Sequence, residues 1–75
     1  MSDKHILVEM KLLPETVALV ERLQKQMGAS NRTDAVARSL ELARLVVQAI
    51  EDGSRVYVET AAGDRRRLVV PYLGD

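Results

Sequence analysis

A repeat of two residues separates an apolar side from a mostly polar side over residues 5–12. The apolar side consists of Ile6, Val8, Met10 and Leu12. The other side consists of His5, Glu9 and Lys11, together with Leu7, which interrupts the polar pattern. A period of two is typical of a strand with one buried face, so we predict a strand over residues 5–12.

The pattern changes to a helical period at Pro14. Proline suits the first position of a helix, where its missing N–H costs nothing, and Glu15 adds a negative charge that the helix dipole favours there. An apolar stripe follows at helical spacing: Val17, Val20, Leu23 and Met27. Gly28 is typical of the residue that ends a helix, so we predict a helix over about residues 14–27.

Asn31 and Asp34 predict the start of a second helix. Asn31 is a favoured N-cap, and Asp34 can reach back to the N–H of Asn31 in a pairing like a capping box. The helix should run to about Glu51, with Gly53 as a second terminating glycine. Its apolar residues form two adjoining stripes: Val36, Leu40, Ala43, Val47 and Ile50, and Ala35, Leu42, Val46 and Ala49. A helix with so narrow a polar strip has to pack against the first helix and against another chain.

The period of two returns after Gly53. Val56, Val58 and Thr60 alternate with Arg55, Tyr57 and Glu59, and a second strand-like run covers residues 67–70 before Pro71. Residues 61–64, with Gly63 among them, are typical of a turn. We therefore predict a C-terminal β-hairpin.

The length of 75 residues allows one small domain whose own core is marginal. The chain has no cysteine, which excludes disulfides and thiolate metal sites, and its single histidine cannot build a zinc site. A second copy of the chain is the remaining means of stabilisation. We therefore predict an obligate oligomer.

Eleven Lys and Arg balance eleven Asp and Glu, so no global field draws the chain to nucleic acid or to a membrane. No nucleophile–base pair, phosphate loop or convergent carboxylate pair stands out, and we expect no enzyme activity, cofactor or metal site. No apolar run is long enough for a transmembrane helix, and the first residues lack the order of regions of a signal peptide. We expect a cytoplasmic protein that does not bind membranes.

The order of strand, helix, glycine turn and capped helix resembles the ribbon-helix-helix family of dimeric DNA-binding proteins (Arc/MetJ/CopG type). The resemblance covers residues 5 to about 50. It is carried by Val8-x-Met10-x-Leu12, Pro14-Glu15, Val17, Val20, Leu23, Met27-Gly28 and Asn31-Arg32-Thr33-Asp34-Ala35-Val36. It implies a mainly α fold with short β: a ribbon-helix-helix (β-α-α) obligate dimer with an intermolecular antiparallel ribbon. Residues 1–52 would form the dimerisation and DNA-binding domain, and residues 53–75 a C-terminal β-hairpin extension.

The family places its ribbon in the major groove of double-stranded DNA, with a phosphate at the N-terminus of the second helix. Carried onto this chain, the base-reading positions are Leu7, Glu9 and Lys11. The phosphate-contacting positions are Lys4, His5, Asn31, Arg32 and Thr33. The resemblance thus implies a sequence-specific transcriptional regulator, either a repressor or an antitoxin whose C-terminal hairpin binds a protein partner.

Other interpretations of the same residues remain open. Leu7, Glu9 and the zero net charge also fit a ribbon-helix-helix dimer that binds protein and not DNA. Glu9 can instead be a cross-strand partner of a basic residue, and Lys11 and His5 ordinary surface residues. Residues 65–67, three arginines, are edge-strand charges, a second phosphate contact or a partner surface. Assembly of dimers into tetramers is also open.

Overall fold

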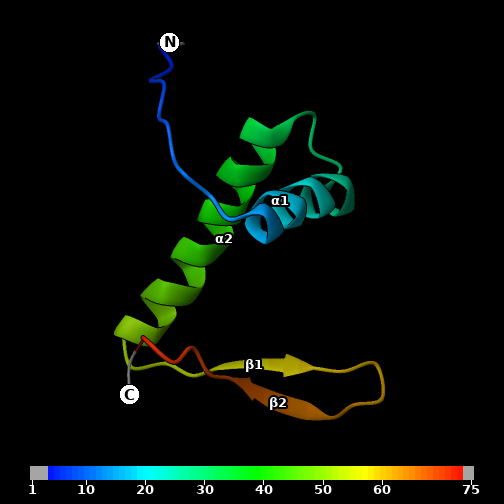
Figure 1. Cartoon of the computed structure of the whole chain (residues 1–75). Coiled ribbons are helices and arrows are strands. Elements are labelled where there is room, and N and C mark those ends of the chain that lie inside the picture. The colour runs from blue at the N-terminus through cyan, green and yellow to red at the C-terminus, as the bar shows by residue number, and fades with distance from the viewer. Residues whose placement is uncertain (1–3, 74–75) are drawn as a thin grey trace. The chain divides into compact units, whose positions relative to one another are not determined.

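The computed structural model describes residues 4–73 and shows two helices followed by a two-stranded antiparallel sheet (Figure 1). The elements are α1 (Pro14–Met27), α2 (Arg32–Glu51), β1 (Val56–Glu59) and β2 (Arg65–Leu68). The mainly helical composition with short β-structure is as predicted. By its internal contacts the chain divides into two compact units, Met1–Ala35 and Val36–Asp75. The predicted functional division into 1–52 and 53–75 stays a prediction.

Helix α1 has the bounds that the sequence predicts. Leu13 is its N-cap, in an extended conformation without a side-chain cap, and Pro14 occupies the first turn. The four residues of the predicted apolar stripe are half-buried, which matches the face assigned from their spacing: Val17, Val20, Leu23 and Met27.

Both helices end at a glycine in the left-handed conformation. Gly28 has φ 65°, and the N–H of Ala29 donates to the carbonyl of Gln24 at 2.9 Å. Gly53 has φ 86°, and the N–H of Ser54 donates to the carbonyl of Ala49 at 2.9 Å. These bonds are those of the Schellman motif, which satisfies the last carbonyls of a helix and requires a residue that tolerates positive φ. Both glycine terminators are confirmed.

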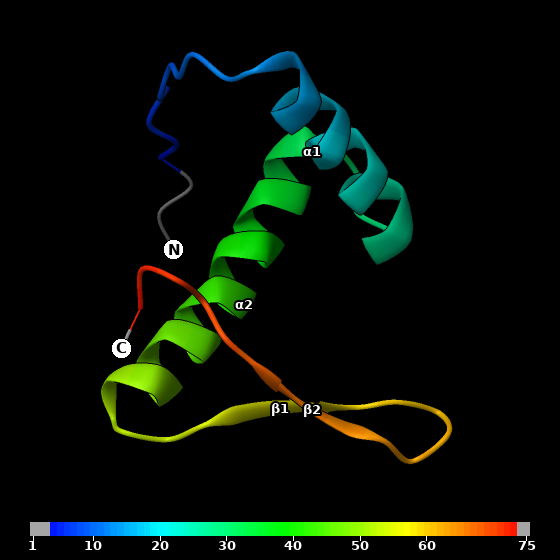
Figure 2. The same ribbon diagram turned by 60° about the horizontal axis from the view of Figure 1, so that its bottom comes forward.

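The two strands form the predicted hairpin, with the second strand two residues earlier than expected. The chain turns aside after α2, continues along β1 and returns antiparallel to it along β2 (Figure 1, Figure 2). The register pairs Val56 with Leu68 and Glu59 with Arg65. The interpretation of residues 67–70 as the second strand was therefore wrong, since β2 is Arg65–Leu68. Val69 and Val70 lie beyond the start of β1 and find no cross-strand partner in it.

The predicted N-terminal strand is not formed. Residues 4–13 have no regular secondary structure and run as a coil ahead of α1 (Figure 1). The apolar side chains expected on a buried face are exposed, among them Ile6 at 86% and Met10 at 65%. A strand requires a neighbour to bond its main-chain N–H and C=O groups, and among the described residues the one sheet consists of β1 and β2, without residues 4–13. The order β-α-α within one chain is thus incorrect: both strands follow the helices.

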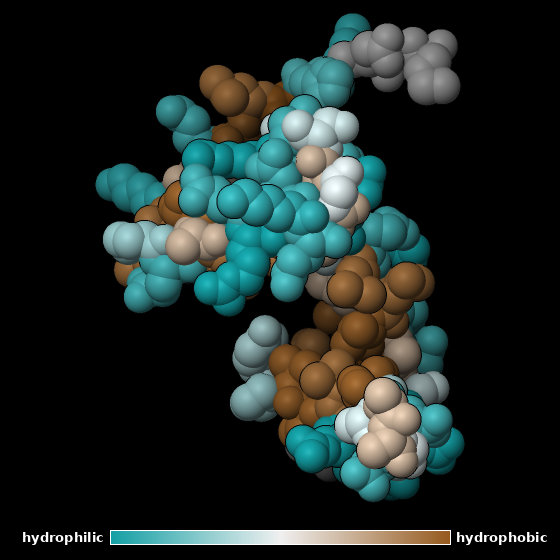
Figure 3. Space-filling model, turned by 90° about the vertical axis from the view of Figure 1, so that its right-hand side faces the viewer, coloured by the Kyte–Doolittle hydropathy of each residue, from teal (hydrophilic) through white to brown (hydrophobic). Residues whose placement is uncertain are grey.

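The described part of the chain has almost no core. Ala35 is its one buried hydrophobic residue, with 1% of its surface exposed. Helix α2 was expected to be covered over most of its circumference, but it exposes Leu40, Leu42 and Leu45 by more than half. In the second unit, hydrophobic side chains gather in a continuous brown surface in the lower half of Figure 3. The single chain therefore leaves uncovered the apolar surface that its sequence pattern marks for burial.

Candidate nucleic-acid interface

The N-terminal segment carries five of the eight site residues that the sequence predicts. All five are exposed: Lys4, His5, Leu7, Glu9 and Lys11. Leu7 is the most exposed large hydrophobic residue of the described chain, at 88%. Such exposure is unfavourable for leucine in water and leaves its side chain available for an apolar contact. Because this segment has no regular structure here, the geometry does not bring the three base-reading positions together.

The other three predicted residues lie at the start of α2, where Asn31 acts as the N-cap. Its Oδ1 accepts a hydrogen bond from the N–H of Asp34 at 2.8 Å, as predicted. The carboxylate of Asp34 accepts from the N–H of Ser30 at 3.3 Å, and not from Asn31 as the capping-box pattern suggested. The Asp34 carboxylate therefore bonds the residue before the N-cap, and not the N-cap residue itself.

The capping arrangement leaves two main-chain donors directed away from the helix. The first N–H groups of any α-helix have no intrahelical acceptor, and Asn31 satisfies that of Asp34. The N–H groups of Arg32 and Thr33 remain, at the positive end of a helix of 20 residues. Both residues are exposed, so their N–H groups and the Thr33 hydroxyl can reach an anion.

The guanidinium of Arg32 is held by a carboxylate from α1. Its Nη2 donates to Oε2 of Glu21 at 2.6 Å, within the first compact unit. The two side chains are 64% and 52% exposed, so solvent screens the pair. No sequence pattern predicted this contact. The partners are 11 residues apart on different helices, and no local periodicity relates such positions.

The hairpin separates its side chains onto two faces. Residues directly opposite each other in an antiparallel pair share a face, and faces alternate along each strand. The register therefore places four residues on one face, which we call the basic face: Tyr57, Glu59, Arg65 and Arg67. The opposite face consists of Val56, Val58, Arg66 and Leu68. The three consecutive arginines are thus divided between the faces, two on one and one on the other.

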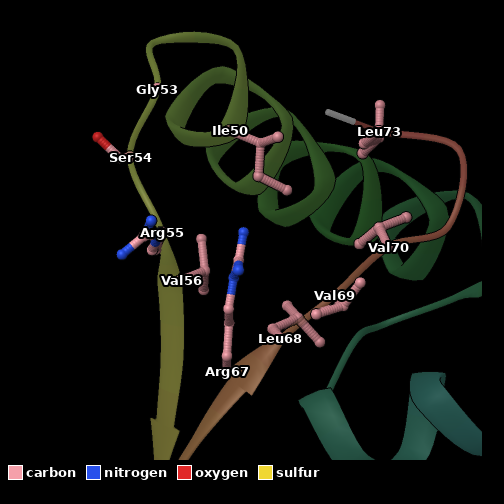
Figure 4. Close-up of a pocket in the computed structure, with 10 residues that line it drawn as sticks. All are labelled: Ile50, Gly53, Ser54, Arg55, Val56, Arg67, Leu68, Val69, Val70 and Leu73. Atoms are coloured by element: carbon pink, nitrogen blue, oxygen red, sulfur yellow. The ribbon is translucent and has the colours of Figure 1, made fainter. Parts of the chain in front are cut away.

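A hollow of about 290 Å³ lies between the end of α2 and the base of the hairpin (Figure 4). Arg67 extends alongside Val56 toward Ile50, whereas Arg55 points away from the hollow (Figure 4). Six of the ten lining residues are apolar: Ile50, Val56, Leu68, Val69, Val70 and Leu73. The other four are Gly53, Ser54, Arg55 and Arg67. The lining contains no His, Cys, Asp or Glu side chain.

Within residues 4–73, no cluster of three or more His, Cys, Asp or Glu side chains could hold a metal ion. Over the same residues, neither helix combines the length and the apolar character that crossing a bilayer requires. Searches of protein-family models, curated proteins and solved structures found no match to the chain. The candidate interface therefore stands on the residues and their geometry.

Proposed function

We propose that the chain is a dimeric, sequence-specific DNA-binding regulator of transcription. In this proposal, residues 5–12 of two copies pair as an antiparallel ribbon that enters the major groove. Exposure of the segment is the observation that supports this most: Ile6 and Val8 are 86% and 65% exposed, in alternation with polar residues. A second copy would supply hydrogen-bond partners for the main chain of this segment and would bury its apolar side chains. In a two-fold symmetric dimer the same segment of each copy pairs with that of the other.

The ribbon would present Leu7, Glu9 and Lys11 to the base edges. A two-stranded ribbon fits the width of the major groove. Lys11 can donate to guanine, Glu9 can accept from the amino group of cytosine, and Leu7 can contact the methyl group of thymine. These three residue types therefore provide a set of contacts that distinguishes bases.

The start of α2 would hold a DNA phosphate. The outward N–H groups of Arg32 and Thr33 and the helix dipole favour an anion, and the Arg32 guanidinium adds a positive charge. Such contacts set the position of a protein on DNA without reading its sequence. Lys4 and His5, just before the base-reading positions, would add to them. The regulator would act in the cytoplasm, as a repressor or as an antitoxin.

Fluorescence anisotropy tests the proposal with duplex DNA from upstream of the gene and with a scrambled duplex, at about 50 and 200 mM salt. The upstream duplex should bind more tightly, and binding should weaken steeply at the higher salt. Lys11→Ala should narrow the preference for the upstream duplex, whereas Arg32→Ala should weaken both duplexes equally. Lys25→Ala is a matched control, because Lys25 is an exposed lysine at the far end of α1. Affinities within about twofold of wild type for both test variants would contradict this docking mode.

The alternative function is a protein-interaction module built on the same dimer. The 88% exposure of Leu7 and the zero net charge favour it, because both suit an apolar contact better than a phosphate backbone. Salt distinguishes the two functions. Phosphate-driven binding falls with ionic strength, whereas an apolar interface is nearly insensitive to it.

A further inference from the structure

The ribbon of the proposed function is a weak source of phosphate affinity. Each copy contributes Glu9 beside Lys11, so the charges on its outward side cancel. Non-specific affinity for DNA comes chiefly from cations that neutralise phosphates and release counterions. A regulator with this ribbon therefore needs a cationic surface elsewhere, and the chain as a whole has no net positive charge.

The basic face of the hairpin is such a surface. It combines two guanidinium groups with one carboxylate, and all of its residues are exposed. Glu59 lies opposite Arg65 in the register, yet within residues 4–73 neither Arg65 nor Arg67 forms an ion pair. Both side chains are exposed, although that of Arg67 also lines the hollow beside Val56 (Figure 4). An external anion can therefore still reach both guanidiniums.

Tyr57 orders part of this face. The guanidinium carbon of Arg65 lies 5.6 Å from the centroid of the Tyr57 ring, in a cation–π contact. A guanidinium has five N–H donors, so a contact with one ring leaves N–H groups that can donate to a phosphate. Holding the side chain in place before binding reduces the conformational entropy that a contact with phosphate would cost.

We propose that the basic face of the hairpin, through Arg65 and Arg67, contacts phosphates of the DNA backbone. Two residues apart on a strand, their side chains start about 6.6 Å apart, far enough for each to take its own phosphate. This inference rests on the proposed function, because it adds a second, sequence-independent contact to the same complex. In a dimer the two hairpins together contribute four guanidiniums. Arg66, on the opposite face beside Val58, makes no such contact.

Single substitutions of neighbouring arginines test the inference. Arg67→Ala and Arg66→Ala remove the same charge from adjacent positions on opposite faces, so they differ in contact and not in net charge. Anisotropy titrations with the upstream and scrambled duplexes at several salt concentrations give the slope of log affinity against log salt. Arg67→Ala should lower affinity for both duplexes by the same factor and reduce the slope by about 0.9 for each phosphate that the protein no longer neutralises. Arg66→Ala should leave the slope at its wild-type value.

The double variant Arg65→Ala/Arg67→Ala gives the largest effect. If all four guanidiniums of a dimer contact phosphates, its slope should be smaller than that of wild type by about 3.6. Arg65→Lys/Arg67→Lys should restore most of the slope, because lysine keeps the charge that neutralises a phosphate. Circular dichroism of each variant establishes that the hairpin and helices persist.

The outcomes separate this inference from the proposed function. If wild type binds the upstream duplex specifically and all hairpin variants keep its slope, the inference is wrong and the ribbon proposal survives. Equal slopes for Arg67→Ala and Arg66→Ala, both reduced, would attribute the effect to net charge and would also overturn it. If wild type binds neither duplex, the proposed function fails first, and the hairpin is then a candidate surface for an acidic protein partner.

Discussion

The side chain of Asn31 satisfies a main-chain donor that α2 cannot satisfy itself. Its Oδ1 accepts from the N–H of Asp34 at 2.8 Å. Asn31→Ala removes this acceptor and should lower the free energy of unfolding by about 0.5–2 kcal/mol, measured by denaturant unfolding with circular dichroism. Asn31→Ser keeps a capping oxygen and should retain most of the stability. Equal losses for the two variants would mean that the cap does not stabilise the helix.

Glu21 acts on the same helix end through Arg32. Its carboxylate lies 2.6 Å from the guanidinium that the proposed function assigns to a phosphate. A phosphate would have to compete with Glu21, so Glu21→Gln should tighten DNA binding by about two- to fivefold, measured by anisotropy. Because the pair is exposed, its removal should change the free energy of unfolding by at most about 1 kcal/mol.

Glu41 provides the control for this prediction. It pairs with Arg44 on α2 and is similarly exposed, so Glu41→Gln removes the same charge away from the proposed phosphate site. An equal gain in DNA affinity for Glu21→Gln and Glu41→Gln would contradict the prediction, because it would show that Glu21 does not compete with a phosphate for Arg32.

Among the elements, the N-terminal segment has the most to gain from a second copy. Val8 belongs to its apolar side and is 65% exposed. In the proposed ribbon this side is buried between the copies, so Val8→Asp would bury an unpaired charge and should abolish dimerisation at micromolar concentration. Sedimentation equilibrium measures the change. Glu9→Gln, on the outward side, should leave the dimer intact, and a dimer that tolerated Val8→Asp would contradict the ribbon.

How far each element could be predicted depends on where its determinants lie. The ends of the helices depend on residues close in sequence. The helix boundaries could therefore be predicted to within about one residue, from Pro14, Gly28 and Gly53 among others. The turn of the hairpin depends on geometry that no periodicity displays. Thr60 accepts from the N–H of Asp64 through its hydroxyl at 3.1 Å and donates its own N–H to the Asp64 carbonyl at 2.7 Å. This closure starts the pairing at residue 65 and moves the second strand.

The candidate site divides in the same way. The cap by Asn31 was predictable, because it depends on residues three apart in sequence. The contact of Arg32 with Glu21 joins residues 11 apart on two different helices, which no local pattern relates. Alternation alone could not show that the N-terminal segment lacks a partner within the described residues. Sequence patterns indicate which surfaces should be buried, but they do not specify whether the same chain or another one buries them.

At the scale of the whole molecule, folding and association should be one process. With Ala35 as the one buried hydrophobic residue among those described, the free energy gained by burial in a single chain is far too small to offset the loss of conformational entropy. In the proposed dimer a second copy would bury exposed apolar residues, which in the two units include Met10, Leu19, Leu40 and Leu42. Stability should therefore be inseparable from protein concentration.

The midpoint of thermal unfolding tests this coupling directly. For a dimer that unfolds to two separate chains, the midpoint rises with total chain concentration, because mass action favours the associated state. Circular dichroism melts from about 1 to 100 µM chain should show a steady increase of several degrees, with sedimentation reporting a dimer throughout. An unchanging midpoint together with a monomeric sedimentation coefficient would mean that one chain folds alone. The exposed segment of residues 5–12 would then be no ribbon, and the proposed mode of DNA binding would lose its basis.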